Sequence, residues 1–569
     1  MKPILVILMM LFAHAAWSVP AQPVQKTVRG ADGATLTIVL CGDENCHFYT
    51  TLDGVPVMPD ETNDCWVLAP QLLDSLSTTW NKRLRTRNVR RATSAAAKRR
   101  KASASSITQK KGLVILVDFT DQRMKSTSTP TKFNQMFNLK GYSADNHRGS
   151  VHDYFYDQSY GALDLTFDIV GPVTASEELA YYGKNQNGDD MHAAQLAIEA
   201  CQLADEAYDL IWSDYDWDGD GEIEQVVIIY AGYGEQGGAP SYTIWPHEWT
   251  LEDAQSYNDG NGPITLGGCT INTYAMTCEL SGASGSTLMG IGTACHEFCH
   301  CLGLPDFYST SYIKNFCMGA WDLLSHGQYN GPGGHGECPP PFTAYERWFC
   351  GWLEPQQLQG HQTITDMPDL QDKPVAYLIR NEAYPTEYFL LENRQATRWG
   401  TYVKNYSDMH GLLVSHVDED EEAWKNNTVN DIASHPRMTI IPANNTYGSW
   451  TGTLYSVSAM LYRGQPFPGA EDITTLDSLS HPQYGGTLYH PNIHGTTALP
   501  FALTDIAETD GLLSFHFESA TPPTSGLQPP TLNPQPSTLN PHYTLQGVPV
   551  QRITTPGIYI TERKVKVKK

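Results

Sequence analysis

The sequence predicts an α+β protein in which a twisted mixed sheet with helices is followed by a β-rich C-terminal module. Gly112–Phe119 is a continuous apolar run, which is typical of a strand buried on both faces. Met191–Tyr208 repeats its apolar residues at helical spacing, which favours an amphipathic helix backing the sheet. Between about 356 and 520 apolar and polar residues alternate, as in strands that bury one face.

Further strands are expected in both parts of the chain. Leu163–Val173 and Gln225–Ala231 would join the mixed sheet. In the C-terminal module, which would form a sandwich, the expected strands are Val375–Ile379, Tyr388–Leu391, Gly411–Ser415 and Leu512–His516.

Composition and charge exclude several classes of protein. The chain has 569 residues, 41% of them apolar, which is enough for several domains and a large core. After the N-terminus no segment approaches about 18 consecutive apolar residues, so we expect no transmembrane helix. The 62 Asp and Glu outnumber the 37 Lys and Arg, and this acidic balance argues against a nucleic-acid partner.

Residues 1–21 have the pattern of a signal peptide. Lys2 precedes the apolar run Ile4–Phe12, and small residues at Ala15, Ser18 and Ala21 offer cleavage sites. We therefore expect a chain that is secreted or displayed on the cell surface.

Residues 22–105 are expected to form a propeptide with a basic processing linker. Thr35–Leu40 and Cys46–Thr51 alternate like strands. Lys82–Lys111 holds 12 of the 37 basic residues and neither Asp nor Glu. Such a run can bind nucleic acid, but without interleaved aromatic residues a protease-sensitive linker fits better. The candidate cleavage points are Arg90-Arg91 and Lys98–Lys101.

The most informative motif reads H-E-x-x-H-x-x-G-x-x-D. On a helix, His296 and His300 project from one face and can bind one metal ion. Gly303 permits a sharp turn after the helix, which would bring Asp306 back as a third ligand. Three protein ligands and one open position are typical of a catalytic zinc, which makes a bound water acidic. Glu297 would take a proton from that water and deliver it to a leaving group.

The residues around the motif favour a helix. Ile291, Ala294, Cys295 and Phe298 form an apolar stripe at helical spacing. A tetrathiolate zinc site is not expected, because the chain has no C-x-x-C pair. Cys295 and Cys299 should therefore pack away from the ligands, as small buried residues or disulfide partners.

A second cation site is predicted in an acidic loop before a strand. Asp216, Asp218, Asp220 and Glu224 place carboxylates at alternate positions around glycines, which suits Ca²⁺. The twelfth position of an EF-hand loop would be Val227, so the loop is not a complete EF-hand. The alternative is a solvated acidic turn.

The extended motif resembles the metzincin clan of zinc endopeptidases, and within it the immune inhibitor A-like family of secreted bacterial proteases. The likeness covers about residues 110–355. The similar segments are Gly141–Pro172, Asp216–Gly221, Ile228–Gly234, Ile244–His247, Gly290–Thr293, Ala320–Leu323, Ala344–Arg347 and Gly351–Leu353. The resemblance implies a metzincin-like catalytic domain over residues 106–355. It also implies zinc, protein or peptide substrates, and a secreted precursor whose own propeptide blocks the site.

Two positions depart from the family pattern. Where the family has Met and then Tyr, this chain has Leu324 and His326. Leu replaces Met at similar volume, so the packing should survive. His326 could donate to the oxyanion as Tyr would, which we favour, or bind zinc, or face solvent. The substitutions leave an alternative function, a catalytically weak zinc-bearing surface binding protein or adhesin.

The C-terminal end of the chain changes character again. Residues 521–542 form a Pro-rich linker with a repeated Thr-Leu-Asn-Pro, which favours an extended conformation. Residues 543–569 resemble the end of a type IX secretion sorting domain, in shortened form. The alternative is a loose basic tail.

Overall fold

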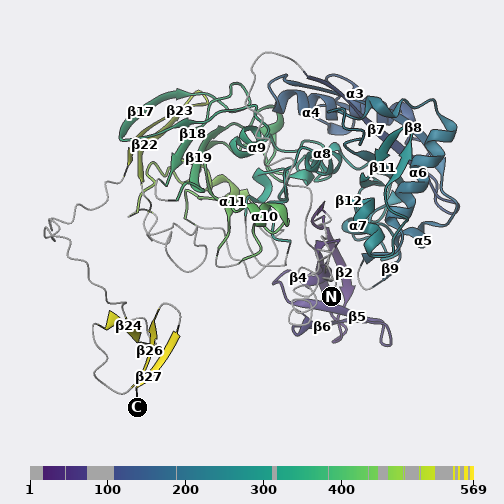
Figure 1. The fold of residues 1–569 in the computed structure, drawn as a ribbon, viewed down its shortest axis with the longest axis horizontal. Helices are drawn as coiled ribbons and strands as arrows, with labels where there is room; N and C mark the ends of the chain where they lie inside the picture. The colour runs from purple at the N-terminus through teal and green to yellow at the C-terminus, as the bar shows by residue number, and fades with distance from the viewer. Residues whose placement is uncertain are drawn as a thin grey trace, which may run out of the picture. The chain divides into compact units, whose positions relative to one another are not determined.

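The structure is a computed structural model, and it divides into two compact units, residues 1–520 and 521–569 (Figure 1). It describes residues 17–22, 24–44, 46–72, 108–186, 189–310, 317–381, 384–432, 435–445, 459–478, 480, 499, 501–519 and strands between 542 and 568. Residues 1–16 of the expected signal peptide lie outside the described residues. The same holds for the basic linker up to residue 107 and for residues 521–541 of the Pro-rich linker.

Within the described residues, six strands form a central sheet in the order β1-β12-β15-β11-β7-β8 (Figure 1). Their bounds are Trp17–Ser18 (β1), His247–Thr250 (β12), Thr273–Leu280 (β15), Val226–Tyr233 (β11), Thr108–Asp118 (β7) and Leu163–Thr174 (β8). Strands β15, β11, β7 and β8 run parallel, whereas β12 and β1 pair antiparallel at one edge. The predicted mixed sheet and its three expected strands are confirmed.

Both faces of this sheet are covered, because successive side chains of a strand point to opposite sides. Leu113 and Ile115 pack with α6 on one face. Val114 and Leu116 pack with α3, α4 and α8 on the other. The helices are α3 (Pro130–Asn138), α4 (Val151–Gln158), α6 (Ala193–Ala207) and α8 (Ile291–His300). The continuous apolar run of β7 therefore reflects burial on both faces, and α6 is the predicted amphipathic helix.

Smaller elements complete the part of this unit that contains the central sheet. The helices α5 (Leu179–Gly183), α7 (Leu251–Ser256) and α9 (Ala344–Phe349) are short. Two small antiparallel pairs join β9 to β10 and β13 to β14. Their bounds are Asn185–Gln186 (β9), Asp189–Asp190 (β10), Ile264–Leu266 (β13) and Cys269–Ile271 (β14).

The N-terminal module is an antiparallel sheet in the order β2-β3-β4-β5-β6. Its strands are Gln25–Arg29 (β2), Thr35–Asp43 (β3), Cys46–Thr51 (β4), Pro56–Asp60 (β5) and Cys65–Leu68 (β6). The two strands predicted in the propeptide correspond to β3 and β4.

The C-terminal part contains two sheets, in the orders β16-β18-β19-β20-β21 and β17-β23-β22. Side chains from both, including Phe389, Leu412, Phe501 and Phe515, share one hydrophobic core. The strands are Gln356–Gln357 (β16), His361–Met367 (β17), Tyr377–Arg380 (β18), Glu387–Arg394 (β19), Gly411–Asp418 (β20), Met438–Ile440 (β21), Phe501–Thr509 (β22) and Leu512–Ser519 (β23). Two short helices accompany them, α10 (Glu421–Lys425) and α11 (Ala459–Arg463).

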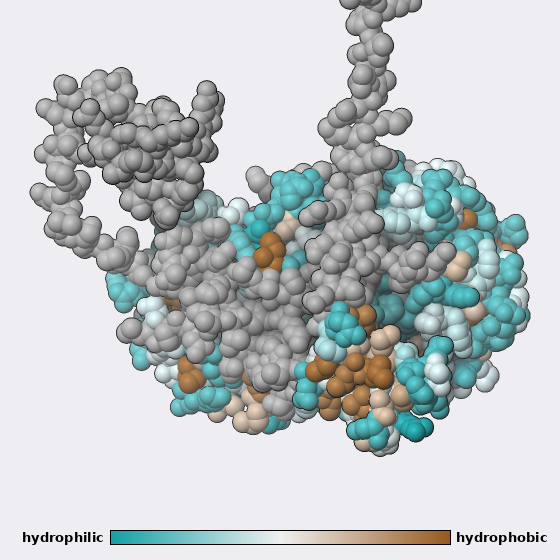
Figure 2. Space-filling view, turned by 90° about the horizontal axis from the view of Figure 1, so that it is seen from below, coloured by the Kyte–Doolittle hydropathy of each residue, from teal (hydrophilic) through white to brown (hydrophobic). Residues whose placement is uncertain are grey.

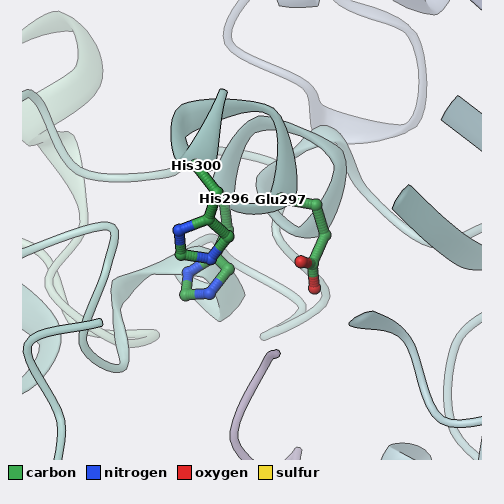
Figure 3. A group of neighbouring side chains, drawn as sticks. All are labelled: His296, Glu297 and His300. Carbon is green, nitrogen blue, oxygen red and sulfur yellow. The ribbon is translucent and has the colours of Figure 1, made fainter. Parts of the chain in front are cut away.

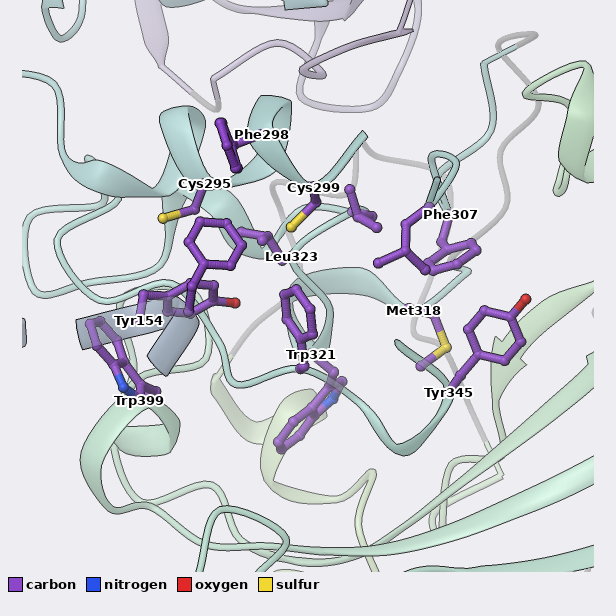
Figure 4. Packing of buried hydrophobic residues seen from close by; sticks show 14 of the residues in the cluster. Tyr154, Cys295, Phe298, Cys299, Phe307, Met318, Trp321, Leu323, Tyr345 and Trp399 are labelled. Carbon is purple, nitrogen blue, oxygen red and sulfur yellow. The ribbon is translucent and has the colours of Figure 1, made fainter. Parts of the chain in front are cut away.

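The core does not stop at the expected boundary near residue 355. A single cluster joins Trp321 and Tyr345 to Trp424, which lies beyond that position. Trp424 Nε1 donates to Tyr345 Oη at 2.7 Å. The ring of Trp399 lies 5.0 Å from that of Tyr154 in α4, and Figure 4 shows both in this cluster. The part that contains the central sheet and the β-rich part are therefore packed as one body.

The second unit is a small antiparallel sheet in the order β25-β24-β26-β27. Its strands are His542–Thr544 (β24), Pro549–Val550 (β25), Gly557–Thr561 (β26) and Lys564–Lys568 (β27). It occupies the segment predicted to be a sorting domain or a loose tail.

On the face shown in Figure 2, the coloured side chains are mostly hydrophilic, with one larger hydrophobic patch and several smaller ones among them. Among the described residues, no helix combines the length and the apolar character that crossing a membrane requires.

Candidate metal centre and active site

Helix α8 carries two candidate ligands and the candidate general base. Its ten residues are all buried, and Phe298 packs in the core beside the sheet. His296 and His300 are about one helical turn apart, so their rings lie on one face with centroids 4.9 Å apart. Glu297 leaves the helix in the same general direction (Figure 3).

The turn after α8 brings the third candidate ligand back to the histidines, as predicted. Gly303 has φ 92°, a conformation that favours glycine, and its N–H donates to the carbonyl of His300 at 2.9 Å. Asp306 Oδ1 lies 3.1 Å from His296 Nε2 and 3.8 Å from His300 Nε2. The three side chains thus point their donor atoms at a common point.

Backbone carbonyls orient both imidazoles. His296 Nδ1 lies 2.8 Å from the carbonyl of Leu323, and His300 Nδ1 lies 2.9 Å from that of Leu304. A carbonyl only accepts, so in both rings Nδ1 carries the hydrogen and Nε2 presents its lone pair. This is the arrangement that histidine ligands need to bind a metal through Nε2.

Asn427, which the sequence analysis missed, holds the third candidate ligand in place. Its Nδ2 donates to Asp306 Oδ2 at 2.7 Å, and Asp306 N donates to its Oδ1 at 2.8 Å. Asn427 is buried and lies 121 positions away in the C-terminal part. No local pattern indicates such a contact.

Glu297 is a buried carboxylate whose two oxygens have no hydrogen-bond partner among the described residues. Burial raises its pKa well above the ordinary value, and the charges of Asp306, Glu248 and Glu44 add to the effect. A buried polar group without a partner is costly unless a ligand completes it. Two imidazoles and a carboxylate are also a zinc donor set. The residues present therefore fit a zinc ion with a water held by Glu297.

The two positions that depart from the family pattern lie beside these ligands. Leu324 is fully buried in the core, and its carbonyl accepts a hydrogen bond from Phe307 N at 2.7 Å, so the packing survives as expected. The ring centroid of His326 lies 5.9 Å from that of Tyr308. Burial lowers the pKa of His326 to about 3, the nearby positive charges of His296 and Lys404 add to this, and Asp306 opposes it. Tyr308, another residue that no motif indicated, therefore lies beside His326.

Cys295 and Cys299 lie in the core cluster, as expected, and not among the ligands (Figure 4). Burial raises the pKa of both thiols well above the ordinary value. They are therefore neutral packing residues.

The first turn of α8 packs closely against the segment Gln328–Gly336. Gly292 N donates to the carbonyl of Gly336 at 3.0 Å. A Cβ on Gly292 would lie 1.9 Å from the carbonyl oxygen of Gln328, so no larger residue fits there. This contact fixes the position of the segment beside the candidate metal centre.

The acidic loop brings together three of its four predicted ligands. Carboxylate oxygens of Asp216, Asp218 and Asp220 lie within 4.8 Å of one another. Glu224 is not part of that group, because its Oε2 accepts a hydrogen bond from Trp217 N at 2.7 Å. Burial raises the pKa of Glu224 to about 7.

The segment Trp17–Gln22 lies beside β12 and α8, although the sequence analysis assigned most of it to the signal peptide. Strand β1 pairs with the edge strand β12 and lies beside α8, and Figure 3 shows purple N-terminal chain facing the ligands. Trp245 Nε1 donates to the carbonyl of Val19 at 2.9 Å, and Tyr329 Oη donates to that of Pro20 at 2.8 Å.

The N-terminal module makes a second contact near the same place. His47 Nε2 lies 3.0 Å from Glu235 Oε1, and the His47 ring stacks on Trp245 with centroids 4.7 Å apart. Burial alone would lower the pKa of His47, but the hydrogen bond and charge of Glu235, with smaller effects of Asp43, raise it overall.

Comparison with known proteins agrees with this geometry. Residues 98–352 match the family model of the immune inhibitor A peptidase M6 catalytic domain. The chain is 28% identical over 424 residues to the pre-pro-metalloprotease PrtV of Vibrio cholerae serotype O1, covering 64% of this chain and 42% of that protein. It is 24% identical over 269 residues to immune inhibitor A of Bacillus thuringiensis subsp. alesti, covering 41% and 38%. The chain thus spans about two fifths of the length of these relatives. Residues 98–352, which contain α8 and the turn after it, are therefore similar to the catalytic domain of the immune inhibitor A peptidase family.

Proposed function

We propose that this chain is a secreted zinc-dependent endopeptidase that hydrolyses peptide bonds of proteins. The observation that carries the proposal is the convergence of His296, His300 and Asp306 beside the buried, unpartnered carboxylate of Glu297. The match of residues 98–352 to the peptidase M6 family model is independent support for peptide-bond hydrolysis.

Several residues of the chain would have separate roles in hydrolysis of the peptide bond. Zinc, when bound by the three ligands, supplies a Lewis acid that polarises the scissile carbonyl. Glu297 takes the proton of the attacking water, because its carboxylate lies beside the histidine ligands and has no hydrogen-bond partner among the described residues. Glu297 then delivers the proton to the leaving nitrogen. His326 donates a hydrogen bond to the oxyanion that develops on the scissile carbonyl.

We further propose that the protein is made as a latent precursor with a metzincin-like catalytic domain over residues 106–355. The segment starting at Trp17 pairs with the edge strand β12, and His47 contacts Glu235 and Trp245. Held there, the N-terminal module would hinder the approach of a substrate along that edge. Cleavage in the basic linker releases the N-terminal module. If the signal peptide is cleaved before Trp17, the segment Trp17–Gln22 stays on the chain. This favours cleavage at Ala15 among the three expected cleavage sites.

The remaining expectations complete the proposal. Asp216, Asp218 and Asp220 hold a Ca²⁺ ion that stiffens the loop before β11. Residues 356–520 form the β-rich module, and residues 543–569 act as a sorting domain for display or release outside the cell.

One observation favours the alternative of a catalytically weak zinc-bearing binding protein. Leu324 and His326 replace the Met and Tyr of the family pattern. If His326 donates poorly to the oxyanion, the chain would keep its metal and lose most of its rate. His326→Tyr separates the two functions, because it creates activity only if the histidine is the defect.

The decisive experiment measures zinc content and casein cleavage on the protein purified from the culture medium after its own cleavage in the basic linker. We expect about one zinc per chain and cleavage of casein. Glu297→Ala should keep zinc and abolish cleavage, and His300→Ala should lose zinc. Glu421→Gln, on the exposed surface, is the matched control and should change neither. Zinc without cleavage in the wild-type chain, on several proteins, would favour the binding-protein alternative.

A further inference from the structure

The side chain of Gln22 is buried against the segment that packs on the start of α8. Only 2% of its surface is exposed, and its backbone N–H donates to the carbonyl of Gln236 at 2.8 Å. Together with part of the segment Gln328–Gly336, Gln22 lines a cavity of about 200 Å³. That segment is bonded to the first turn of α8, because Gly290 N donates to the carbonyl of His335 at 2.8 Å. Gln22 therefore lies next to the helix that carries the candidate ligands.

Backbone groups bind both ends of the Gln22 amide. Gln22 Nε2 donates to the carbonyl of Gly334 at 3.1 Å, and Gly282 N donates to Gln22 Oε1 at 3.3 Å. Because a carbonyl only accepts and a backbone N–H only donates, these two partners determine the orientation of the amide. Gln22 Nε2 also donates to Ser281 Oγ at 3.0 Å. A carboxamide satisfies both backbone partners at once, whereas a carboxylate has no hydrogen to donate to the Gly334 carbonyl.

Glu337 holds the carbonyl of Gly334 in place. Glu337 Oε1 accepts a hydrogen bond from Gly333 N at 3.1 Å, and its Oε2 accepts one from His335 N at 3.0 Å. Glu337 is buried and thus fixes the residues on both sides of Gly334. Its negative charge lies behind the wall, where it opposes the entry of a second carboxylate. Both the hydrogen bonds and the charge therefore favour a neutral amide.

Main-chain contacts hold the rest of the N-terminal segment. Strand β1 pairs antiparallel with the edge strand β12. The carbonyls of the next two residues, Val19 and Pro20, accept hydrogen bonds from Trp245 Nε1 at 2.9 Å and from Tyr329 Oη at 2.8 Å. These contacts use the backbone of the segment, so another extended peptide that adds to the same edge could make them. Gln22, in contrast, is recognised through its side chain.

We propose that the groups around the Gln22 amide form a substrate subsite that selects a carboxamide side chain, foremost glutamine, after the N-terminal segment has been released. Glutamine reproduces the contacts of Gln22, whereas glutamate loses the hydrogen bond to the Gly334 carbonyl and meets the charge of Glu337. Asparagine carries its amide on a side chain one methylene group shorter, so its amide lies farther from these partners. The inference rests on the proposed function, because it requires the same edge strand to bind substrate peptides.

The test uses the protein after its own cleavage in the basic linker, with a mixed peptide library and mass spectrometry of the products. We expect glutamine to be enriched at one position near the cleaved bond. A peptide with Gln there should be cleaved about tenfold faster in kcat/KM than its twin with Met, which has a similar length and no amide. The twin with Glu should be cleaved more slowly still, because Glu337 repels it.

Ser281→Ala tests the contact that a side chain of the protein makes with the amide. The variant removes the hydroxyl that accepts a hydrogen bond from Nε2 and leaves the two backbone partners. The ratio of Gln to Met cleavage should therefore fall about threefold. Ser284→Ala, on an exposed serine three residues later, is the matched control and should leave the ratio unchanged.

A second measurement keeps the test decisive if Ser281→Ala impairs folding, and it does not depend on catalysis. In the uncleaved precursor carrying Glu297→Ala, hydrogen–deuterium exchange reports how firmly the segment Trp17–Gln22 is held. Gln22→Glu and Gln22→Met should each accelerate exchange of its backbone amides about tenfold, since both remove the donor to the Gly334 carbonyl. Gln25→Glu, on an exposed residue of β2, makes the same change of charge and should not accelerate exchange.

The outcomes separate the subsite from the proposed function. Cleavage without a preference for Gln, a ratio undiminished by Ser281→Ala, or unchanged exchange in Gln22→Met overturns the subsite and leaves the protease standing. A wild-type protein that cleaves neither casein nor any library peptide contradicts the proposed function, and the substrate subsite falls with it.

Discussion

Replacing Asn427 tests whether the C-terminal part supports Asp306, the third candidate metal ligand. Asn427 makes two buried hydrogen bonds to Asp306, at 2.7 and 2.8 Å, and one of them is to the carboxylate itself. Asn427 has φ 51°, so glycine removes the side chain without straining the backbone, whereas alanine would add about 1 kcal/mol of strain. Asn427→Gly is therefore the informative change.

We expect Asn427→Gly to weaken zinc binding by about 10- to 100-fold, which corresponds to about 1.4–2.7 kcal/mol. The reason is that Asp306 loses the partner that orients its second oxygen. The assay is competition for zinc with a chromogenic chelator, on full chain carrying Glu297→Ala so that it does not digest itself.

The control for this experiment is Asn426→Gly, one residue earlier and half-buried, which should leave the zinc affinity unchanged. An affinity of Asn427→Gly within about twofold of its parent would refute the reasoning, because Asp306 would bind equally well without the amide that holds its second oxygen. Asn427→Ala should bind zinc as weakly as Asn427→Gly and unfold at lower denaturant concentration.

Three further predictions concern other parts of the molecule. Gly292→Ala should destabilise the fold by about 3 kcal/mol in urea denaturation, because its Cβ meets the Gln328 carbonyl; unchanged stability would contradict that close approach. The pKa of His47 is raised from 6.5 by Glu235, so docking of the N-terminal module is strongest below pH 6.5 and weakens as pH rises through the raised pKa. Self-processing of the precursor should therefore accelerate as the pH rises through the raised pKa of His47, and His47→Phe should abolish this pH dependence. Chelation of Ca²⁺, or Asp218→Asn, should lower Tm by about 2–4 °C, and equal melting with and without Ca²⁺ would rule out the calcium site.

Local patterns predicted the elements and the centre of the site well. The H-E-x-x-H spacing determines which face of α8 carries the imidazoles, and Gly303 marks the turn that returns Asp306. The apolar run of β7 and the helical spacing of α6 likewise identified the central sheet and its backing helix. In each case the signal lies within about a dozen consecutive residues.

The features that were missed depend on contacts between distant residues. Asn427 is an unremarkable polar residue until the fold brings it to Asp306. Trp17–Gln22 resembles the end of a leader in composition, but β12 offers an unpaired edge to which an extended segment can add. Glu224 fits the alternation of the acidic loop, yet it turns to the backbone of Trp217 instead.

The continuous core across residue 355 has a consequence for the timing of activity during synthesis. Every residue of the metal-binding motif has been made once the ribosome passes Asp306, yet Asn427 and the packing of Trp424 follow only later. A nascent or truncated chain therefore carries the complete motif without its support. Formation of the candidate metal centre is therefore delayed until the C-terminal part has emerged from the ribosome and packed.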